Sequence, residues 1–367
     1  MRFLFDLTHP AVVHIFLPVI EQLKSRGHEI EIVSRDKDLT TTLLDEANLR
    51  HTVLSRATSG KFNMLLELAK REIGMLRIVR RFKPHLIAGT SANAARVGLY
   101  TGTRSAIVNE DDAAIVPLFR WSAYPFSSAI ITPQVLAFEN YGPRHLTYPA
   151  FEKLFYLHPN RFKADPAVHE QLAAGSPDGE YIIFRFSALR AHHDEGATGL
   201  GIDLVNDLID YFAPQTNIWL SSENQLPAEW QKFAFPLPRM KMHSALAKAQ
   251  VLLCDSQSMS VEAGVLGVKS LRLNSFVGKL SVLKELDRRG LTEGFCPQEE
   301  GKYLARVKEY YANRAAEDVA QKERHVKLLR ETIDPLPWFC EVIESLAKGD
   351  PLEKIYKMDA AFSNANA

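Results

Sequence analysis

The densest group of chemically active side chains in this sequence follows an apolar run at residues 181–184. It reads RFSALRAHHDEG from Arg185 onward, with two arginines, two histidines and two acids in twelve residues. Arginine offers a planar fork for phosphate oxygens, and histidine can donate a hydrogen bond or carry a proton. We expect Arg185, Arg190 and His193 to bind an anion here and His192 to take part in catalysis. A solvated loop and a His-His-Asp zinc site are the alternatives. Adjacent histidines on one loop seldom point at one metal, so no metal site is expected.

A second group reads CDSQSMSVEA from Cys254 to Ala263, an apolar run followed by a hydroxyl-rich turn and a helical pattern. The N-terminus of a helix carries unpaired amides and the positive end of a dipole, which suit a pyrophosphate. We expect Ser256 and Ser258 to lie beside those phosphates and Glu262 to accept hydrogen bonds from ribose hydroxyls. The alternative is an ordinary capped helix, with Asp255 or Ser256 as N-cap and Glu262 in solvent. Cys254 ends the apolar run and is expected in the core.

The N-terminal run is followed by DLTHP, which places His9 in a tight loop and His14 about one turn further on. His9 is a candidate catalytic residue, because histidine exchanges protons near neutral pH. The alternatives are that His9 caps the helix and that His14 packs against a neighbour. In Gly89-Thr90-Ser91 the hydroxyls are expected to cap the next helix.

Three consecutive carboxylates follow the strand predicted at 105–108, in Asn109-Glu110-Asp111-Asp112. Such acids either begin a solvated helix or act as acid–base and hydroxyl-binding groups. Glu110 is taken as a catalytic candidate, and Asp112 as a weaker one. The spacing is not specific for a divalent cation held by Asp111 and Asp112.

These groups need a scaffold that presents them together, and the alternation of short apolar runs with helical periods supplies one. The predicted strands of the first half are 3–5, 29–33, 51–54, 85–88, 105–108 and 129–132; those of the second are 181–184, 217–220, 251–254 and 270–273. We predict an α/β protein of two Rossmann-like, doubly wound parallel-sheet domains facing a cleft. In such sheets ligands bind outside the carboxyl ends of the strands, where the groups above lie.

Four segments are predicted along the chain: an N-terminal domain over 1–155, a C-terminal domain over 156–335, a helix over 336–350 that crosses back to the first domain, and a tail over 351–367. The first boundary rests on the proline- and glycine-rich stretch 151–179. Pro18 is compatible with the helix predicted over 13–26 if it falls in the first turn.

Composition limits the function classes. The 44 basic and 44 acidic residues cancel, which gives no support for nucleic-acid binding. Three cysteines without a CxxC pair suit a reducing compartment, and the start shows no signal-peptide pattern, so a cytoplasmic location is expected. No apolar run is long enough to span a membrane. The basic, partly apolar helix predicted over 62–81 leaves peripheral membrane contact open.

The motifs DLTHP, RFSALRAHHDEG, CDSQSMSVEAGVLG and LNSFVG together resemble domain-of-unknown-function family 354, over the chain to about residue 345. These are microbial proteins of the glycosyltransferase-B type, often implicated in surface polysaccharide synthesis. The layout is more distantly similar to non-hydrolysing UDP-N-acetylglucosamine 2-epimerases. Their nucleotide motif matches Asp255-Ser256, Glu262-Ala263 and Leu266-Gly267 here, but their Gly-Gly is Gln257-Ser258. Their Gly-Asp-Thr run matches Gly89-Thr90-Ser91, so that carboxylate is missing.

The resemblance implies a glycosyltransferase that uses a UDP-sugar-like donor, without a required cofactor, in cell-surface polysaccharide or glycoconjugate synthesis. The second domain would hold the donor. The first would hold an unknown acceptor, a glycan or lipid-linked molecule, with His9 or Glu110 as base. The alternatives are an epimerase or hydrolase on the same class of nucleotide sugar, and a non-catalytic nucleotide-sugar-binding protein.

Overall fold

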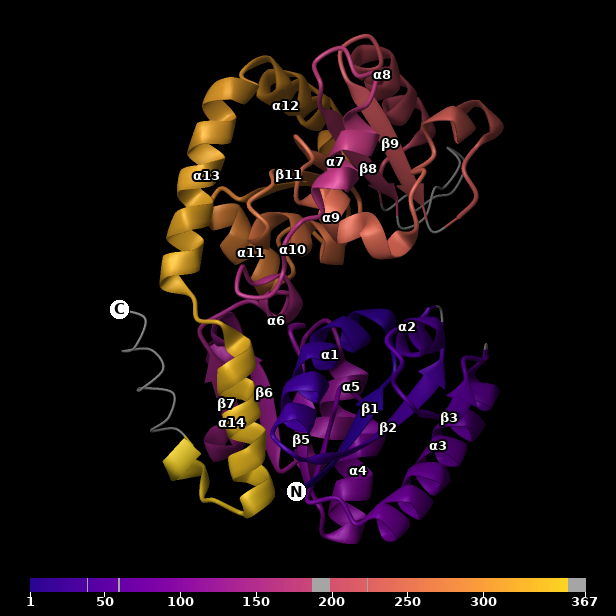
Figure 1. The fold of residues 1–367 in the computed structure, drawn as a ribbon, viewed down its shortest axis with the longest axis vertical. Helices are drawn as coiled ribbons and strands as arrows, with labels where there is room; N and C mark the ends of the chain where they lie inside the picture. The colour runs from indigo at the N-terminus through magenta and orange to yellow at the C-terminus, as the bar shows by residue number, and fades with distance from the viewer. Residues whose placement is uncertain (38, 59, 187–198, 223, 356–367) are drawn as a thin grey trace. The chain divides into compact units, whose positions relative to one another are not determined.

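A computed structural model describes residues 1–37, 39–58, 60–186, 199–222 and 224–355. The chain forms two compact units, and each is described separately here. Unit 1 comprises Met1–His158 together with the chain from Thr332 onward, and unit 2 comprises Pro159–Glu331. Each unit is built on one sheet whose described strands are all parallel, so the predicted α/β class with two parallel-sheet domains is confirmed (Figure 1).

The sheet of unit 1 has seven strands in the order β3-β2-β1-β4-β5-β6-β7. Their bounds are β1 (Arg2–Leu7), β2 (Glu29–Asp36), β3 (Thr52–Arg56), β4 (Leu86–Gly89), β5 (Arg104–Val108), β6 (Ala129–Pro133) and β7 (His145–Tyr148). The order changes direction between β1 and β4, which is the point where ligands bind in sheets of this kind.

Helices cover both faces of this sheet. They are α1 (Pro10–Ser25), α2 (Thr40–Glu46), α3 (Lys61–Phe82), α4 (Ala92–Thr101), α5 (Pro117–Ala123), α6 (Leu154–Leu157) and α14 (Pro335–Lys348). Alternate residues of β1 serve the two faces, as the period of a strand requires. Leu4 joins a core with α3 and α4, whereas Phe5 packs on Phe16 of α1, which in turn contacts Phe339 of α14.

The sheet of unit 2 has five strands in the order β12-β11-β10-β8-β9. Their bounds are β8 (Tyr181–Phe186), β9 (Asn217–Ser222), β10 (Leu252–Cys254), β11 (Ser270–Leu273) and β12 (Thr292–Phe295). The main helices are α7 (Pro166–Ala173), α8 (Ile202–Phe212), α9 (Met242–Leu246), α10 (Gln257–Val265), α11 (Ser281–Arg288), α12 (Glu300–Ala312) and α13 (Arg314–Glu331). Here the order changes direction between β8 and β10.

Two strands were missed by the sequence analysis, and both are edge strands. We predicted six strands in the first half, but β7 is a seventh; its His145 is satisfied by a hydrogen bond to Thr132 at 2.8 Å, so a polar residue is tolerated there. The strand β12 reads Thr-Glu-Gly-Phe and lacks the apolar run used to recognise the others. Neither strand therefore shows the uninterrupted apolar run by which the other strands were predicted.

The placement expected for Pro18 was also wrong. Pro18 lies inside α1 rather than in its first turn, where Pro10 stands. Burial of Val19, Ile20 and Leu23 after it holds the helix together despite the lost backbone hydrogen bond. In the part of the chain that the structure describes, no helix is long and apolar enough to cross a membrane.

Candidate functional site

The turn from β10 into α10 lies at the direction change of the second sheet. Ser256 is the N-cap of α10, and its Oγ accepts a hydrogen bond from the Met259 amide at 3.4 Å. Ser258 is exposed, and its Oγ lies 3.5 Å from that of Ser256. The first turn of α10 carries no acidic side chain, so no carboxylate competes for an anion at this helix end. The capping role weighed for Ser256 is therefore present, and it leaves Ser258 turned to solvent.

Close packing fixes the start of this turn. The backbone carbonyl of Asp255 accepts a hydrogen bond from Asn274 Nδ2 at 2.8 Å. A Cβ at Gly199 would lie 2.4 Å from Asp255 Oδ2, so only glycine fits at that position. Gly199 thus packs directly against the β10–α10 turn.

Glu262 lies further along α10, and its side chain is largely buried. Its side chain is 11% exposed, and its Oε1 lies 3.4 Å from Nε2 of His243 in α9. The alternative of a solvated Glu262 is therefore wrong, because α9 covers this part of α10. His243 was not singled out in the sequence; a lone histidine in a helix carries no pattern that would reveal it.

The arginine-histidine motif is only partly described. Arg185 lies on β8, where its Nη1 donates to Ser221 Oγ of β9 at 3.1 Å. Arg190, His192 and His193 lie outside the described residues. Cys254 is buried, and burial raises the pKa of its thiol to about 11, which agrees with the predicted core role.

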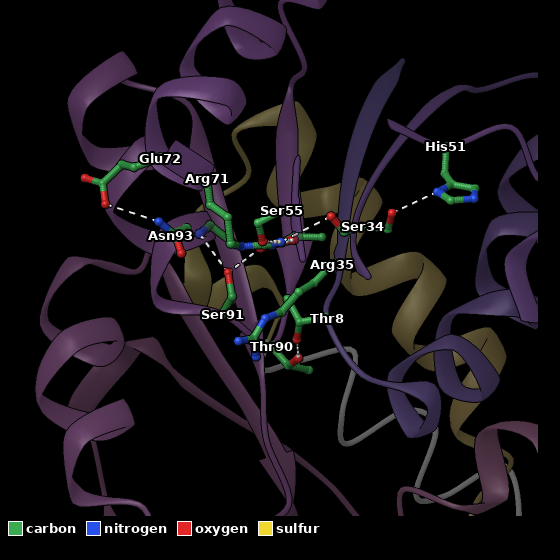
Figure 2. Close-up of polar contacts among 12 residues, drawn as sticks. Thr8, Ser34, Arg35, His51, Ser55, Arg71, Glu72, Thr90, Ser91 and Asn93 are labelled. Carbon is green, nitrogen blue, oxygen red and sulfur yellow. Dashed lines mark hydrogen bonds and ion pairs between the residues drawn. The ribbon is translucent and has the colours of Figure 1, made fainter. Parts of the chain in front are cut away.

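A buried ion pair occupies the direction change of the first sheet (Figure 2). Arg71 of α3 donates from Nη2 to Asp6 Oδ1 at 2.6 Å, and both side chains are at most 3% exposed. Ser91, the N-cap of α4, donates to the other oxygen of Asp6 and accepts from Ala94 N. Ser91 is therefore a cap, as predicted. Asp6 is shielded from any ligand by these two partners.

Two threonines at the same edge of the sheet are drawn below Ser91 in Figure 2. Thr8 Oγ1 and Thr90 Oγ1 are 3.5 Å apart, one after β1 and one after β4. The two strands approach so closely that a Cβ at Gly89 would lie 2.8 Å from the Asp6 carbonyl oxygen. Between β1 and β4 this edge of the sheet therefore presents hydroxyl groups, while the carboxylate of Asp6 is buried in its ion pair.

His9 and His14 both take the structural roles weighed for them. His9 is the N-cap of α1, where its Nδ1 accepts from the Ala11 amide at 3.3 Å. His14 packs on the ring of Tyr156 at 5.4 Å between centroids. The side chain of His9 is exposed in this capping position.

Glu110 belongs to a cluster of buried charges beyond β5. Lys153 Nζ donates to Glu110 Oε1 at 2.5 Å and to Glu152 Oε1 at 3.3 Å. Burial, together with the charge of Glu110, raises the pKa of Asp111 to about 6 and that of Glu152 to about 8. Glu152 therefore keeps its proton at neutral pH, and the pKa of Asp111 lies just below neutrality; raised pKa values of this kind are found at acid–base sites. Lys153 and Glu152 were missed because the sequence analysis assigned them to a connecting stretch.

Asp112 is buried, and its backbone carbonyl accepts from Ile115 and Val116. Among the residues that the structure describes, no group of three or more His, Cys, Asp or Glu side chains is arranged to hold a metal ion.

Comparisons with known proteins bear on the fold. No family model matches the chain, so the resemblance to family 354 stays a prediction. No curated protein matches it either. Solved structures, by contrast, do match the chain in fold. A putative UDP-N-acetylglucosamine 2-epimerase from Listeria monocytogenes has a TM-score of 0.69 at 11% identity, covering 94% of this chain and 96% of the other.

Two further structures illustrate the range of matches. The UDP-GlcNAc 2-epimerase from Neisseria meningitidis bound to UDP-GlcNAc has a TM-score of 0.64 at 14% identity, over 90% of this chain and all of the other. The glycosyltransferase VinC in complex with dTDP has a TM-score of 0.58 at 11% identity, over 96% of this chain and all of the other. At such identities the likeness establishes the two-domain α/β fold shared by both groups of enzymes.

Proposed function

We propose that this chain is a nucleotide-sugar-dependent enzyme, and specifically a glycosyltransferase that uses a UDP-sugar-like donor. The observation that carries the proposal is the pairing, on α10, of an acid-free helix N-terminus at the direction change of the sheet with a buried carboxylate at Glu262. Glu262 is largely buried beside His243, and a carboxylate held in this way can accept hydrogen bonds from ribose hydroxyls. Structures of the same fold that hold UDP-GlcNAc or dTDP support this assignment.

Each group has a role in the proposed transfer. The amides at the start of α10, with Ser256 and Ser258, bind the diphosphate, whose negative charge grows as the sugar leaves. Arg185, together with Arg190 and His193, supplies further donors to that leaving group. His192 is proposed as a catalytic donor in the same step.

We assign the binding site of the acceptor to unit 1. Glu110 is proposed as the base that takes the proton of the acceptor hydroxyl, with Lys153 as its positioning residue at 2.5 Å. His9, exposed at the start of α1, is the second candidate for that role. The acceptor is proposed to be a glycan or lipid-linked molecule of surface polysaccharide synthesis, which the resemblance to family 354 implies.

Replacing Glu262 by alanine tests the nucleotide site. A hydrogen bond to a charged group contributes about 1.5–3 kcal/mol, so Glu262→Ala should weaken UDP binding roughly 10- to 150-fold in titration calorimetry. Glu317→Ala is the matched control, because Glu317 is a similarly buried carboxylate of unit 2, paired with Arg306 at 2.7 Å. Equal UDP affinity in the wild type and Glu262→Ala would refute the assignment.

Epimerisation is the second candidate, favoured by the fold likeness to the 2-epimerases. Against it, Thr90 and Ser91 stand where those enzymes have an acid, and the nearest carboxylate, Asp6, is buried in its ion pair. Incubation with UDP-N-acetylglucosamine in deuterated water separates the two. Solvent deuterium in the recovered sugar indicates epimerisation, and acceptor-dependent release of UDP indicates transfer. Thermal stabilisation by nucleotide sugars without turnover of any would indicate a binding protein.

A further inference from the structure

One layer of helices in unit 1 is strongly basic. The helices α3, α4 and α5 contain eight basic and two acidic residues, although the formal net charge of the whole chain is zero. The helices α1, α2, α6 and α14, which pack around α1 on the other face of the sheet, contain two basic and five acidic residues. Unit 1 therefore has one basic and one acidic side, and a basic side attracts an anionic partner.

Both acids of the basic layer are already neutralised. The helix α4 contacts α3 and α5, and all three share one core with β1, β4 and β5. Glu67 is 6% exposed, and its Oε1 lies 2.6 Å from Nε of Arg35. Glu72 pairs with Arg96 of α4 at 2.6 Å and accepts a hydrogen bond from Asn93, as Figure 2 shows. The charge that these helices turn to solvent is therefore positive.

The solvent face of α3 combines cations with apolar side chains. Five exposed residues recur at intervals of three or four and so share the face opposite the core: Leu66, Lys70, Ile73, Arg77 and Arg80. Among the residues that the structure describes, none of the three cations on this face lies in an ion pair with a carboxylate. A helix face of this composition is typical of a helix that lies on a membrane surface.

Large apolar side chains on α5 and α4 extend this surface. Leu118 is 85% exposed and Trp121 70% exposed, on the side of α5 turned away from the core. Leu99 and Tyr100, near the end of α4, are each more than half exposed. Arg120 places a further cation 5.6 Å from the centre of the Trp121 ring. Tryptophan and tyrosine are enriched at the headgroup level of membranes, where an apolar ring meets a polar surrounding.

Charge complementarity selects one occupant for this surface. A second copy of the chain bound through the same face would bring like charges together, because a two-fold interface pairs a surface with itself. A nucleic acid would contact the cations but would leave aliphatic side chains such as Leu118 without an apolar partner. An anionic bilayer uses both kinds of group, since its headgroups attract cations and its acyl boundary accepts apolar side chains.

We propose that the outer surface of α3, α4 and α5 binds an anionic lipid bilayer, with Lys70, Arg77 and Arg80 against the headgroup phosphates and Leu118 and Trp121 inserted between the headgroups. The proposal does not rest on the proposed transferase activity, because binding to a bilayer requires neither nucleotide nor turnover. If both hold, the surface brings unit 1 to the membrane that contains a lipid-linked acceptor.

Sedimentation of the full chain with lipid vesicles tests the charged part of the surface. Vesicles of equal parts phosphatidylcholine and phosphatidylglycerol should bind about tenfold or more tightly than phosphatidylcholine alone, and added salt should weaken the binding. Each cation near an anionic surface contributes about fivefold, so Arg77→Gln with Arg80→Gln should weaken binding roughly 25-fold. The matched control is Lys24→Gln with Lys348→Gln, two exposed cations of α1 and α14, which should bind as the wild type does.

A second pair of variants tests the apolar part. Leu118→Ser with Trp121→Ser should weaken binding to the same vesicles about tenfold or more, because both side chains lose their insertion into the bilayer. Val319→Ser with Val326→Ser removes two exposed apolar side chains of α13 in unit 2 and should leave the binding unchanged. All four altered chains should unfold at temperatures close to that of the wild type, since the replaced side chains are exposed.

Tryptophan fluorescence locates the contact. Trp121 is the most exposed of the four tryptophans, so its insertion should shift the emission to shorter wavelengths when anionic vesicles are added. Trp121→Phe should still bind the vesicles but should lose this shift.

Three kinds of result would overturn the proposal. The first is no binding to anionic vesicles, or equal binding to phosphatidylcholine alone. The second is binding that both surface pairs of variants leave intact, or that occurs without a shift of the Trp121 emission. The third is another occupant: duplex DNA bound in preference to the vesicles and released by Arg77→Gln with Arg80→Gln, or a dimer in solution that Leu118→Ser with Trp121→Ser separates.

Discussion

The buried pair of Asp6 and Arg71 should be a main determinant of the stability of unit 1. Arg71→Met keeps most of the apolar stem but removes the bond to Asp6 Oδ1 at 2.6 Å and a second bond to the Ser34 carbonyl at 3.2 Å. Asp6 is fully buried, so its charge would be left in the core without its cation. Removing one partner of such a pair costs about 3–5 kcal/mol.

The assay is thermal unfolding followed by calorimetry. For domains of this size about 1 kcal/mol shifts Tm by roughly 2–4 °C, so Arg71→Met should lower Tm of unit 1 by about 6–20 °C. The rate of amide hydrogen exchange in β1 and β4 should rise as the stability falls, because these strands flank the pair.

Two controls separate burial from the mere loss of a charge. Arg96→Met breaks a similarly short pair with Glu72, at 2.6 Å, whose side chains are 21% and 18% exposed, and should cost about 1 kcal/mol. The double variant Asp6→Asn with Arg71→Met removes the stranded charge and should be more stable than Arg71→Met alone. Equal losses for Arg71→Met and Arg96→Met, or no recovery in the double variant, would refute the reasoning.

Three further outcomes are expected. Because burial raises the pKa of Glu152 to about 8, the folded chain holds a proton that the unfolded chain releases above about pH 4.5. The wild type should therefore lose stability in urea as pH rises from about 5 to 8, and Glu152→Gln should show a smaller loss; parallel profiles would contradict this. Gly89→Ala should cost about 1–3 kcal/mol in the same assay, since its Cβ would meet the Asp6 backbone, whereas Gly301→Ala, with open space around it, should not. Of the three cysteines only Cys296 is partly exposed, so Ellman's reagent should modify one thiol in the native chain; a second fast thiol would contradict the burial of the others.

Much of the fold was predictable from short-range pattern. The strand at 270–273 begins and ends where the sequence placed it, and α4 begins directly after its predicted Ser91 cap, because a buried apolar run and a helix cap are local signals. Strands β7 and β12 were not, since β7 contains a buried histidine that is satisfied by a bond to Thr132, 13 residues away, and β12 has no apolar run.

Part of the candidate site was likewise predictable from local sequence, and part of it was not. The order strand, hydroxyl turn and helix around Ser256 is contained in ten consecutive residues, and the structure reproduces it. The partners of Glu262 and Glu110 are not local: His243 lies on another helix, and Lys153 is 43 residues away from Glu110.

By its periodicity the sequence alone determined two layered α/β units and which residues stand at the carboxyl ends of their strands, because side-chain direction repeats every two residues in a strand and about every 3.6 in a helix. Only the tertiary structure decided which charges meet. Folding brings Arg71 of α3 against Asp6 of β1, 65 residues away in the sequence. Because both side chains are then removed from water, each charge needs the other as its partner. No pattern of neighbouring residues encodes this pairing.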